Sequence, residues 1–145
     1  MRTQFMKTIA VAATLTVAGF AGAYAEEVTY TAKLIGASET PPNTTTGTGT
    51  VAAKYDTATK MLSWTIDYSG LTGPAIAAHF HGPAPVGKAA PIMVPIKDSL
   101  DSPMKGSATL TDDQAKALTD GMMYFNIHTA ANKPGEIRGQ LEKGM

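Results

Sequence analysis

The sequence predicts an all-β domain, built as an antiparallel β-sandwich or barrel with one short helix. Two observations carry this prediction. Apolar and polar residues alternate through most of the chain after residue 26, which is the pattern of strands that bury one face. Clusters of Gly, Pro, Asn and Asp separate these stretches at short intervals, as they do in sandwiches and barrels.

The stretch 61–68 shows the alternation most clearly, with apolar side chains on one face and mostly small polar ones on the other. The remaining candidates also carry alternating apolar residues, many of them β-branched or aromatic, and these side chains favour strands. We expect strands over residues 28–35, 50–55, 61–68, 75–81, 92–96, 103–110, 122–129 and 136–142.

A single segment has the pattern of a helix, and it covers residues 111–120. Thr111 is a candidate N-cap, and Gln114 follows three residues later, as in a capping box. Two aspartates occupy the first turn, where the helix dipole favours negative charge. Gly121 is a suitable residue to end the helix. We therefore expect one short helix between two strands.

The N-terminal residues 1–25 have the layout of a secretory signal peptide. A basic start is followed by an apolar stretch over 8–22, and Ala23-Tyr24-Ala25 provides an A-x-A cleavage site. The apolar stretch is short for a membrane span. We expect cleavage, a secreted or periplasmic location, no membrane span in the mature protein, and one mature domain over 26–145.

The composition of this mature part excludes several classes of function. It carries ten basic and twelve acidic residues, and without a basic patch we expect no nucleic-acid partner. The chain has no cysteine, so no disulfide stabilises it and no thiolate is available as a metal ligand or nucleophile. Any metal must be held by nitrogen, oxygen or thioether.

The three histidines of the chain fall in two short motifs. His79 and His81 lie two apart in a predicted strand, so their side chains point to the same side. His128 lies in a later strand. Three neutral imidazoles suit copper or zinc, whereas calcium and magnesium prefer oxygen. The sequence predicts a metal site here if the two strands are neighbours, with water, Glu136 or Met122 as candidate fourth ligands; the alternative is a metal-free, hydrogen-bonded polar cluster.

The polar residues around these histidines fall in phase with them, on the face opposite the apolar residues. If the last two strands form a symmetric hairpin, Glu136 lies opposite His128 and Asn126 lies opposite Arg138. Glu136 would then accept the imidazole N–H of His128, as carboxylates often do beside metal ligands. Arg138 would pair with Glu136 or Asp67, or stay in solvent. We expect Glu136, Arg138 and Asn126 to surround and orient the ligands.

Several of these motifs occur together in a known family. Ala78-His79-Phe80-His81-Gly82-Pro83-Ala84, Asn126-Ile127-His128-Thr129 and Gly135-Glu136-Ile137-Arg138-Gly139-Gln140 resemble the CHRD domain. This module is named after its repeats in chordin and also occurs as single-domain secreted bacterial proteins. The resemblance extends from about Tyr30 to Leu141.

The resemblance implies an antiparallel Greek-key β-sandwich similar to that of copper–zinc superoxide dismutase, in which an H-x-H strand also supplies metal ligands. This chain departs from that enzyme, because its three histidines leave none for the bridged two-metal site and it has no disulfide. The comparison is one of fold and motif alone. We therefore expect at most one copper or zinc ion and no dismutase activity of that two-metal type.

Two functions follow as hypotheses. In the first, the chain is a secreted or periplasmic binding protein that holds one copper or zinc ion through His79, His81 and His128. In the second, it is a metal-free structural or protein-interaction module with a protein partner in the envelope, and its loops 39–46 and 82–91 form the contact surface. We do not expect an enzyme; superoxide dismutation by a single copper is the enzymatic alternative.

Overall fold

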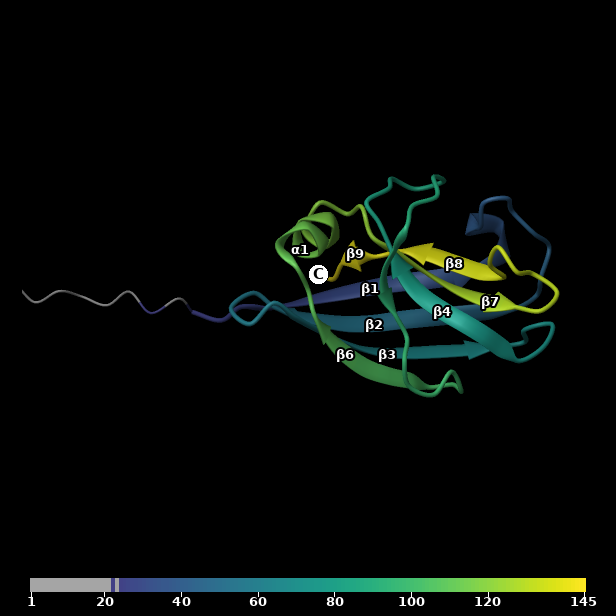
Figure 1. The fold of residues 1–145 in the computed structure, drawn as a ribbon, viewed down its shortest axis with the longest axis horizontal. Coiled ribbons are helices and arrows are strands. Elements are labelled where there is room, and N and C mark those ends of the chain that lie inside the picture. Colours follow the sequence, from purple (N-terminus) through teal and green to yellow (C-terminus); the bar gives the residue numbers. More distant parts are fainter. Residues whose placement is uncertain (1–21, 23) are drawn as a thin grey trace, which may run out of the picture.

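The computed structural model describes residues 22 and 24–145 (Figure 1). The predicted signal peptide, 1–25, lies almost wholly outside these residues. Within the described part, no helix has the length and apolar character needed to cross a membrane.

The described part is an antiparallel β-structure with one α-helix, so the predicted all-β class is confirmed. Most observed strands agree with the predicted ones to within two residues. The predicted last strand is divided in two at Leu141, whose N–H donates to the carbonyl of Met123 over 2.9 Å. The strands are β1 (Glu27–Ile35), β2 (Thr48–Asp56), β3 (Met61–Ser69), β4 (Ala75–His81), β5 (Ile92–Pro95), β6 (Met104–Thr109), β7 (Tyr124–Thr129), β8 (Ile137–Gln140) and β9 (Glu142–Lys143).

All of these strands belong to one continuous sheet, in the order β5-β4-β7-β8-β1-β2-β3-β6, and β9 also pairs with β1. The sheet curls so that β4 crosses over β2 and β3 (Figure 1). The Nε2 of Gln114, next to the edge strand β6, donates to the carbonyl of Met93 on the other edge strand, β5, over 2.9 Å. The result is a sheet nearly closed into a barrel, and the predicted Greek-key sandwich of superoxide-dismutase type is not confirmed.

The core fills the inside of this curled sheet. Trp64 from β3 contacts Phe80 from β4, with ring centroids 5.1 Å apart, and Phe80 in turn contacts Phe125 from β7 at 4.7 Å. These aromatic contacts join the two halves of the sheet. Ile76 in β4 is 52% exposed, although it alternates with the buried Ala78 and Phe80, because a register shift between Ala75 and Ala77 interrupts the pairing there.

The predicted helix is confirmed as α1 (Asp112–Thr119). Thr111 and Gln114 form both hydrogen bonds of the capping box. Gly121 follows the helix with φ +71°, a conformation that glycine adopts without strain. The helix buries Ala117 and Leu118, and Leu118 packs in the hydrophobic core.

Candidate metal centre

The three histidines converge on one side of the sheet. Strands β4 and β7 are direct neighbours, with Ala77 opposite His128 and His79 opposite Asn126. One ligand nitrogen from each of His79, His81 and His128 lies within 4.8 Å of the other two. The two strands that carry the histidines are therefore neighbours, which was the condition for the predicted site, and the three rings form one cluster.

His128 is oriented by a backbone carbonyl. Its Nδ1 lies 2.7 Å from the oxygen of Lys133, and because a carbonyl can only accept, Nδ1 carries the proton. The other nitrogen, Nε2, therefore has a free lone pair. It lies 3.1 Å from Nδ1 of His79, which donates to it in the neutral protein. Two nitrogens on a tetrahedral zinc, each about 2.0–2.1 Å from the ion, lie about 3.3 Å apart, so this separation is close to that of a ligand pair.

His81 is the most enclosed of the three rings. It is 8% exposed and stacks on the ring of Tyr124 with centroids 4.9 Å apart. Its Nδ1 lies 3.0 Å from the carbonyl oxygen of Ala90. Its Nε2 lies 3.0 Å from Oδ1 of Asn126. Since Nδ1 must donate to Ala90, Nε2 is the nitrogen left to bind a cation.

Burial also favours the neutral form of two of these rings, His79 and His81. The pKa of His79 is lowered to about 4, mainly by loss of solvent and in smaller part by the neighbouring His128 and His81. Burial likewise lowers the pKa of His81, although its contacts with Ala90 and Asn126 oppose this shift. Neutral imidazole is the form that binds a metal ion, so at neutral pH these two rings have the required protonation state.

Comparison with known proteins identifies the family of the chain. Residues 30–141 match the CHRD domain family. The chain belongs to this family. No curated protein and no solved structure gives a significant match to the chain. The match includes all three histidines, so the cluster is part of the CHRD domain itself.

The prediction that Glu136 accepts from His128 is wrong. In this CHRD domain the Glu136 carboxylate is buried and accepts four hydrogen bonds: from Oγ1 of Thr45 (2.6 Å), from N and Oγ1 of Thr72 (both 2.8 Å) and from Oγ1 of Thr129 (2.6 Å). Burial alone would raise the pKa of Glu136, but these hydrogen bonds outweigh it and lower the pKa to about 2. Glu136 therefore joins three segments of the chain and is not available to the metal or to His128.

The prediction that Arg138 pairs with Glu136 or Asp67, or stays in solvent, is also wrong. Asn126 does lie opposite Arg138 as predicted, but Arg138 is only 2% exposed. Its guanidinium stacks 3.4 Å above the ring of Tyr124 and donates to Oγ1 of Thr40 and to the carbonyl of Lys88. The loops around Thr40 and Lys88 thus cover the face that the sequence pattern placed outside the core.

Glu39 is a residue that the sequence analysis missed. It follows the 3-10 turn Gly36–Ser38, in the loop 39–46 that the second hypothesis assigned to a contact surface, yet it is 3% exposed. Burial raises the pKa of Glu39 to about 7, although Arg138 and hydrogen bonds from Thr40 and Asn126 lower it in part. No periodic pattern marks a loop residue, so the sequence offers no signal for this burial.

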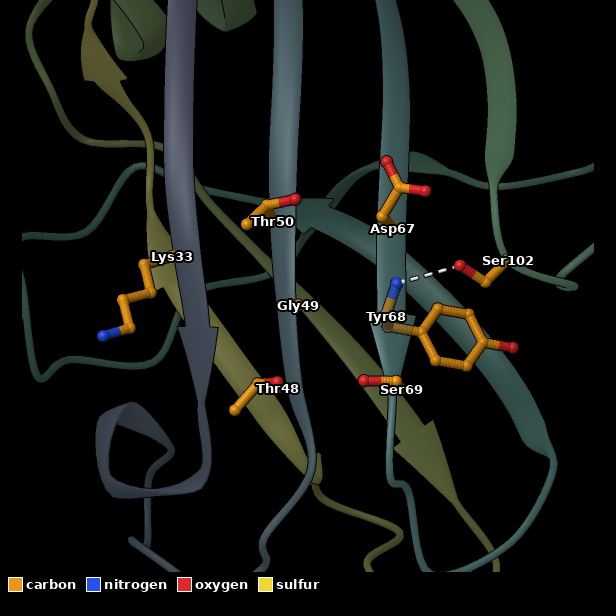
Figure 2. A pocket seen from close by; sticks show the side chains of 8 residues that line it. All are labelled: Lys33, Thr48, Gly49, Thr50, Asp67, Tyr68, Ser69 and Ser102. Atoms are coloured by element: carbon orange, nitrogen blue, oxygen red, sulfur yellow. Dashed lines mark hydrogen bonds between the residues drawn. The ribbon is translucent and has the colours of Figure 1, made fainter.

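A separate hollow lies away from the histidines. Figure 2 shows this pocket, with a volume of about 610 Å³, against strands β1, β2 and β3. Lys33 and Asp67 stand on opposite sides of it, and the backbone N–H of Tyr68 donates to Oγ of Ser102 over 2.9 Å. Its polar side chains are mostly exposed and do not converge. The histidine cluster is therefore the stronger candidate for a functional site.

The lowered pKa of His79 predicts a pH-dependent stability of the metal-free protein. The unfolded chain binds a proton on this ring near its ordinary pKa of about 6.5, whereas the folded protein resists protonation down to about pH 4. The stability contribution is therefore complete above the unfolded pKa and is lost as pH falls towards 4. Thermal unfolding with a chelator present, between pH 4 and 7, should show a smaller decrease for His79→Gln than for the wild type. Parallel curves for the two proteins would contradict this expectation.

Proposed function

We propose that this CHRD domain is a secreted or periplasmic protein that binds one copper or zinc ion through His79, His81 and His128. The observation that carries the proposal is the cluster of one nitrogen from each ring within 4.8 Å. Copper and zinc are the ions that a set of neutral nitrogens without thiolates favours. The protein would then serve in sequestration or delivery of the metal, and not in catalysis.

The hydrogen bonds around the cluster support this role. The Lys133 carbonyl holds His128 with Nε2 directed at His79, and the Ala90 carbonyl leaves Nε2 of His81 as its ligand atom. Backbone carbonyls that accept the second N–H of a ligating histidine are a common feature of metal sites, because they orient the ring. Glu136 is fully engaged with threonines, so water is the simplest fourth ligand.

Isothermal titration calorimetry of the tag-free mature domain with zinc at pH 7.5 tests the proposal. We expect one ion per chain for the wild type and no measurable binding for the double variant His79→Ala/His81→Ala. The chain has three histidines, so a tag-free protein offers the ion no competing imidazole. Affinity should also fall as pH approaches 4, because His79, with a pKa of about 4, becomes protonated there and protonated imidazole cannot bind the ion. Equal affinity of wild type and double variant would eliminate the site.

One observation favours the second function, a metal-free structural or protein-interaction module. Each of the three rings has a hydrogen-bonding partner within the protein itself, so the cluster can order the sheet without an ion. In that case the double variant would lose some thermal stability, and the wild type would bind neither copper nor zinc. The loops 39–46 and 82–91 would then provide the contact surface for a protein in the envelope.

A further inference from the structure

Arg138 is a buried cation that no carboxylate neutralises by direct contact. It is 2% exposed, and the three ion pairs of the described part of the chain involve other residues. Its hydrogen bonds go to uncharged oxygens, Oγ1 of Thr40 at 3.2 Å and the carbonyl of Lys88 at 2.7 Å. The ring of Tyr124 adds a cation–π contact but no negative charge. A buried charge without an opposite charge is costly, so Arg138 is a candidate to receive an anion.

The guanidinium group also keeps unused donors. An arginine side chain has five N–H groups, and the bonds to Thr40 and Lys88 use one on each terminal nitrogen. Nε donates no hydrogen bond to the described residues, yet it is not one of their fully enclosed unpartnered atoms. The Nε–H of Arg138 is therefore open to solvent or to a ligand, although the side chain as a whole is covered.

A cleft reaches this guanidinium from the surface. Its volume is about 390 Å³, and Arg138 and Gln140 of β8 line it together with Lys33 of β1. Ser38, from the turn that precedes Thr40, and Val86, from the loop that contains Lys88, also line it. The cleft is thus bordered by both of the loops that cover Arg138. Its volume is in the range of small-molecule sites, about 300–1,000 Å³.

Lys33 brings a second cation to the same face of the sheet. Ile35 of β1 pairs with Arg138 of β8, so Lys33, two residues before Ile35, projects to the same side as Arg138. Diagonal neighbours on adjacent strands lie about 7–8 Å apart. Gly139 permits the close approach of the strands, because a β-carbon there would collide with the backbone carbonyl of Lys33. The Lys33 side chain is exposed and points away from Asp67 (Figure 2).

We propose that this cleft binds a small carboxylate that carries an apolar group, and that Arg138 and Lys33 hold its two oxygens. The planar fork of a guanidinium matches the two acceptor oxygens of a carboxylate. Val86 is 75% exposed and lines the cleft, so the apolar group of the ligand has a side chain to cover. Glu142 lines the cleft as well, but the two cations leave its net charge positive.

The proposed site does not depend on the metal site, because no histidine lines the cleft. The test therefore uses tag-free mature domain that has been stripped of metal on a chelating resin, so that no soluble chelator competes as an anion. NMR at pH 7 follows the ¹⁵N–¹H signal of the Arg138 Nε–H during titration with pentanoate. Pentanamide, which has the same shape and no charge, is the control ligand.

We expect pentanoate to shift the Arg138 signal to saturation with a Kd on the order of 1 mM, as suits a ligand of few atoms. Pentanamide should give no saturable shift, because the guanidinium gains no opposite charge from it. The absence of a saturable shift with pentanoate, or an equal shift with pentanamide, would overturn the proposal.

Lys33→Ala tests the second cation without removing the buried guanidinium. Its matched control is Lys105→Ala, which removes an exposed lysine from β6, outside the lining of the cleft. We expect Lys33→Ala to weaken pentanoate binding about threefold, the size of effect typical of an exposed charge pair, and Lys105→Ala to leave it unchanged. Equal affinities of the two variants would show that the ligand is not held between Arg138 and Lys33.

Inorganic phosphate tests the chemical class of the ligand. Phosphate also pairs with guanidinium groups, but it has no apolar group to place against Val86. We therefore expect it to bind more weakly than pentanoate in the same titration. Tighter binding of phosphate than of pentanoate would overturn the assignment of the cleft to an apolar carboxylate.

Discussion

Replacing Glu136 with alanine is expected to lower the free energy of unfolding by about 3 kcal/mol or more, since each buried donor left without an acceptor costs about 1–3 kcal/mol. The variant would leave the hydroxyls of Thr45, Thr72 and Thr129 and the N–H of Thr72 without the carboxylate that now accepts from them. These three residues lie in the β1–β2 loop, the β3–β4 loop and the end of β7. One side chain therefore holds three segments that are distant in sequence.

Urea denaturation of Glu136→Ala and of a control at an exposed glutamate, Glu142→Ala, would measure this effect at pH 7. The control should change stability by less than about 0.5 kcal/mol, as surface substitutions usually do. Glu136→Gln should fall between the two, because an amide keeps the shape but has one oxygen instead of two. A loss for Glu136→Ala no larger than that of the control would show that the threonine hydrogen bonds do not stabilise the fold.

The low pKa of Glu136 also predicts how this loss of stability depends on pH. Its folded pKa of about 2 lies below the ordinary value of 4.5, so its contribution is present above the unfolded pKa and is lost as pH falls towards 2. The difference in stability between wild type and Glu136→Ala should therefore shrink with acidification. Urea denaturation of the wild type and of Glu136→Ala at pH 7 and at pH 3 measures this change in the stability difference.

Replacing His128 with alanine is expected to weaken zinc binding by about a hundredfold or more, since even a change in the groups that orient a ligand commonly costs 10–100-fold in affinity. His128 supplies Nε2, which the Lys133 carbonyl holds 3.1 Å from Nδ1 of His79. Without it, two nitrogens from a single strand remain. Calorimetric titration of the tag-free domain at pH 7.5 is the measurement.

The control for His128→Ala is Lys133→Ala. Residue 133 acts on His128 through its backbone carbonyl, so removing its side chain should leave zinc affinity within about twofold of the wild type, because the orienting hydrogen bond is kept. Retention of full affinity in His128→Ala would remove this ring from the site. A large loss in Lys133→Ala would show instead that the turn, and not the imidazole, determines binding.

The sequence predicted the histidine cluster because the alternation of side chains along a strand determines which side each histidine faces. A period of two places His79 and His81 on one side of a strand, and the phase of 122–129 places His128 on the same side as Asn126. The hairpin register was also predictable, with Asn126 opposite Arg138. The hydrogen-bond partner of His128 was not predictable. The carboxylate of Glu136 accepts from Thr129 at the strand end, and a backbone carbonyl accepts from His128 instead.

Local pattern by itself determined the strands, the capped helix and the side of the sheet on which the polar residues lie, because alternation and capping depend on residues close together in the chain. Tertiary structure alone decided that this polar side is buried. Two loops without periodicity, carrying Glu39 and the carbonyls of Lys88 and Ala90, lie over Arg138 and His81. The energy of that arrangement comes from contacts between residues as many as 98 positions apart, such as Thr40 and Arg138, which no local pattern records.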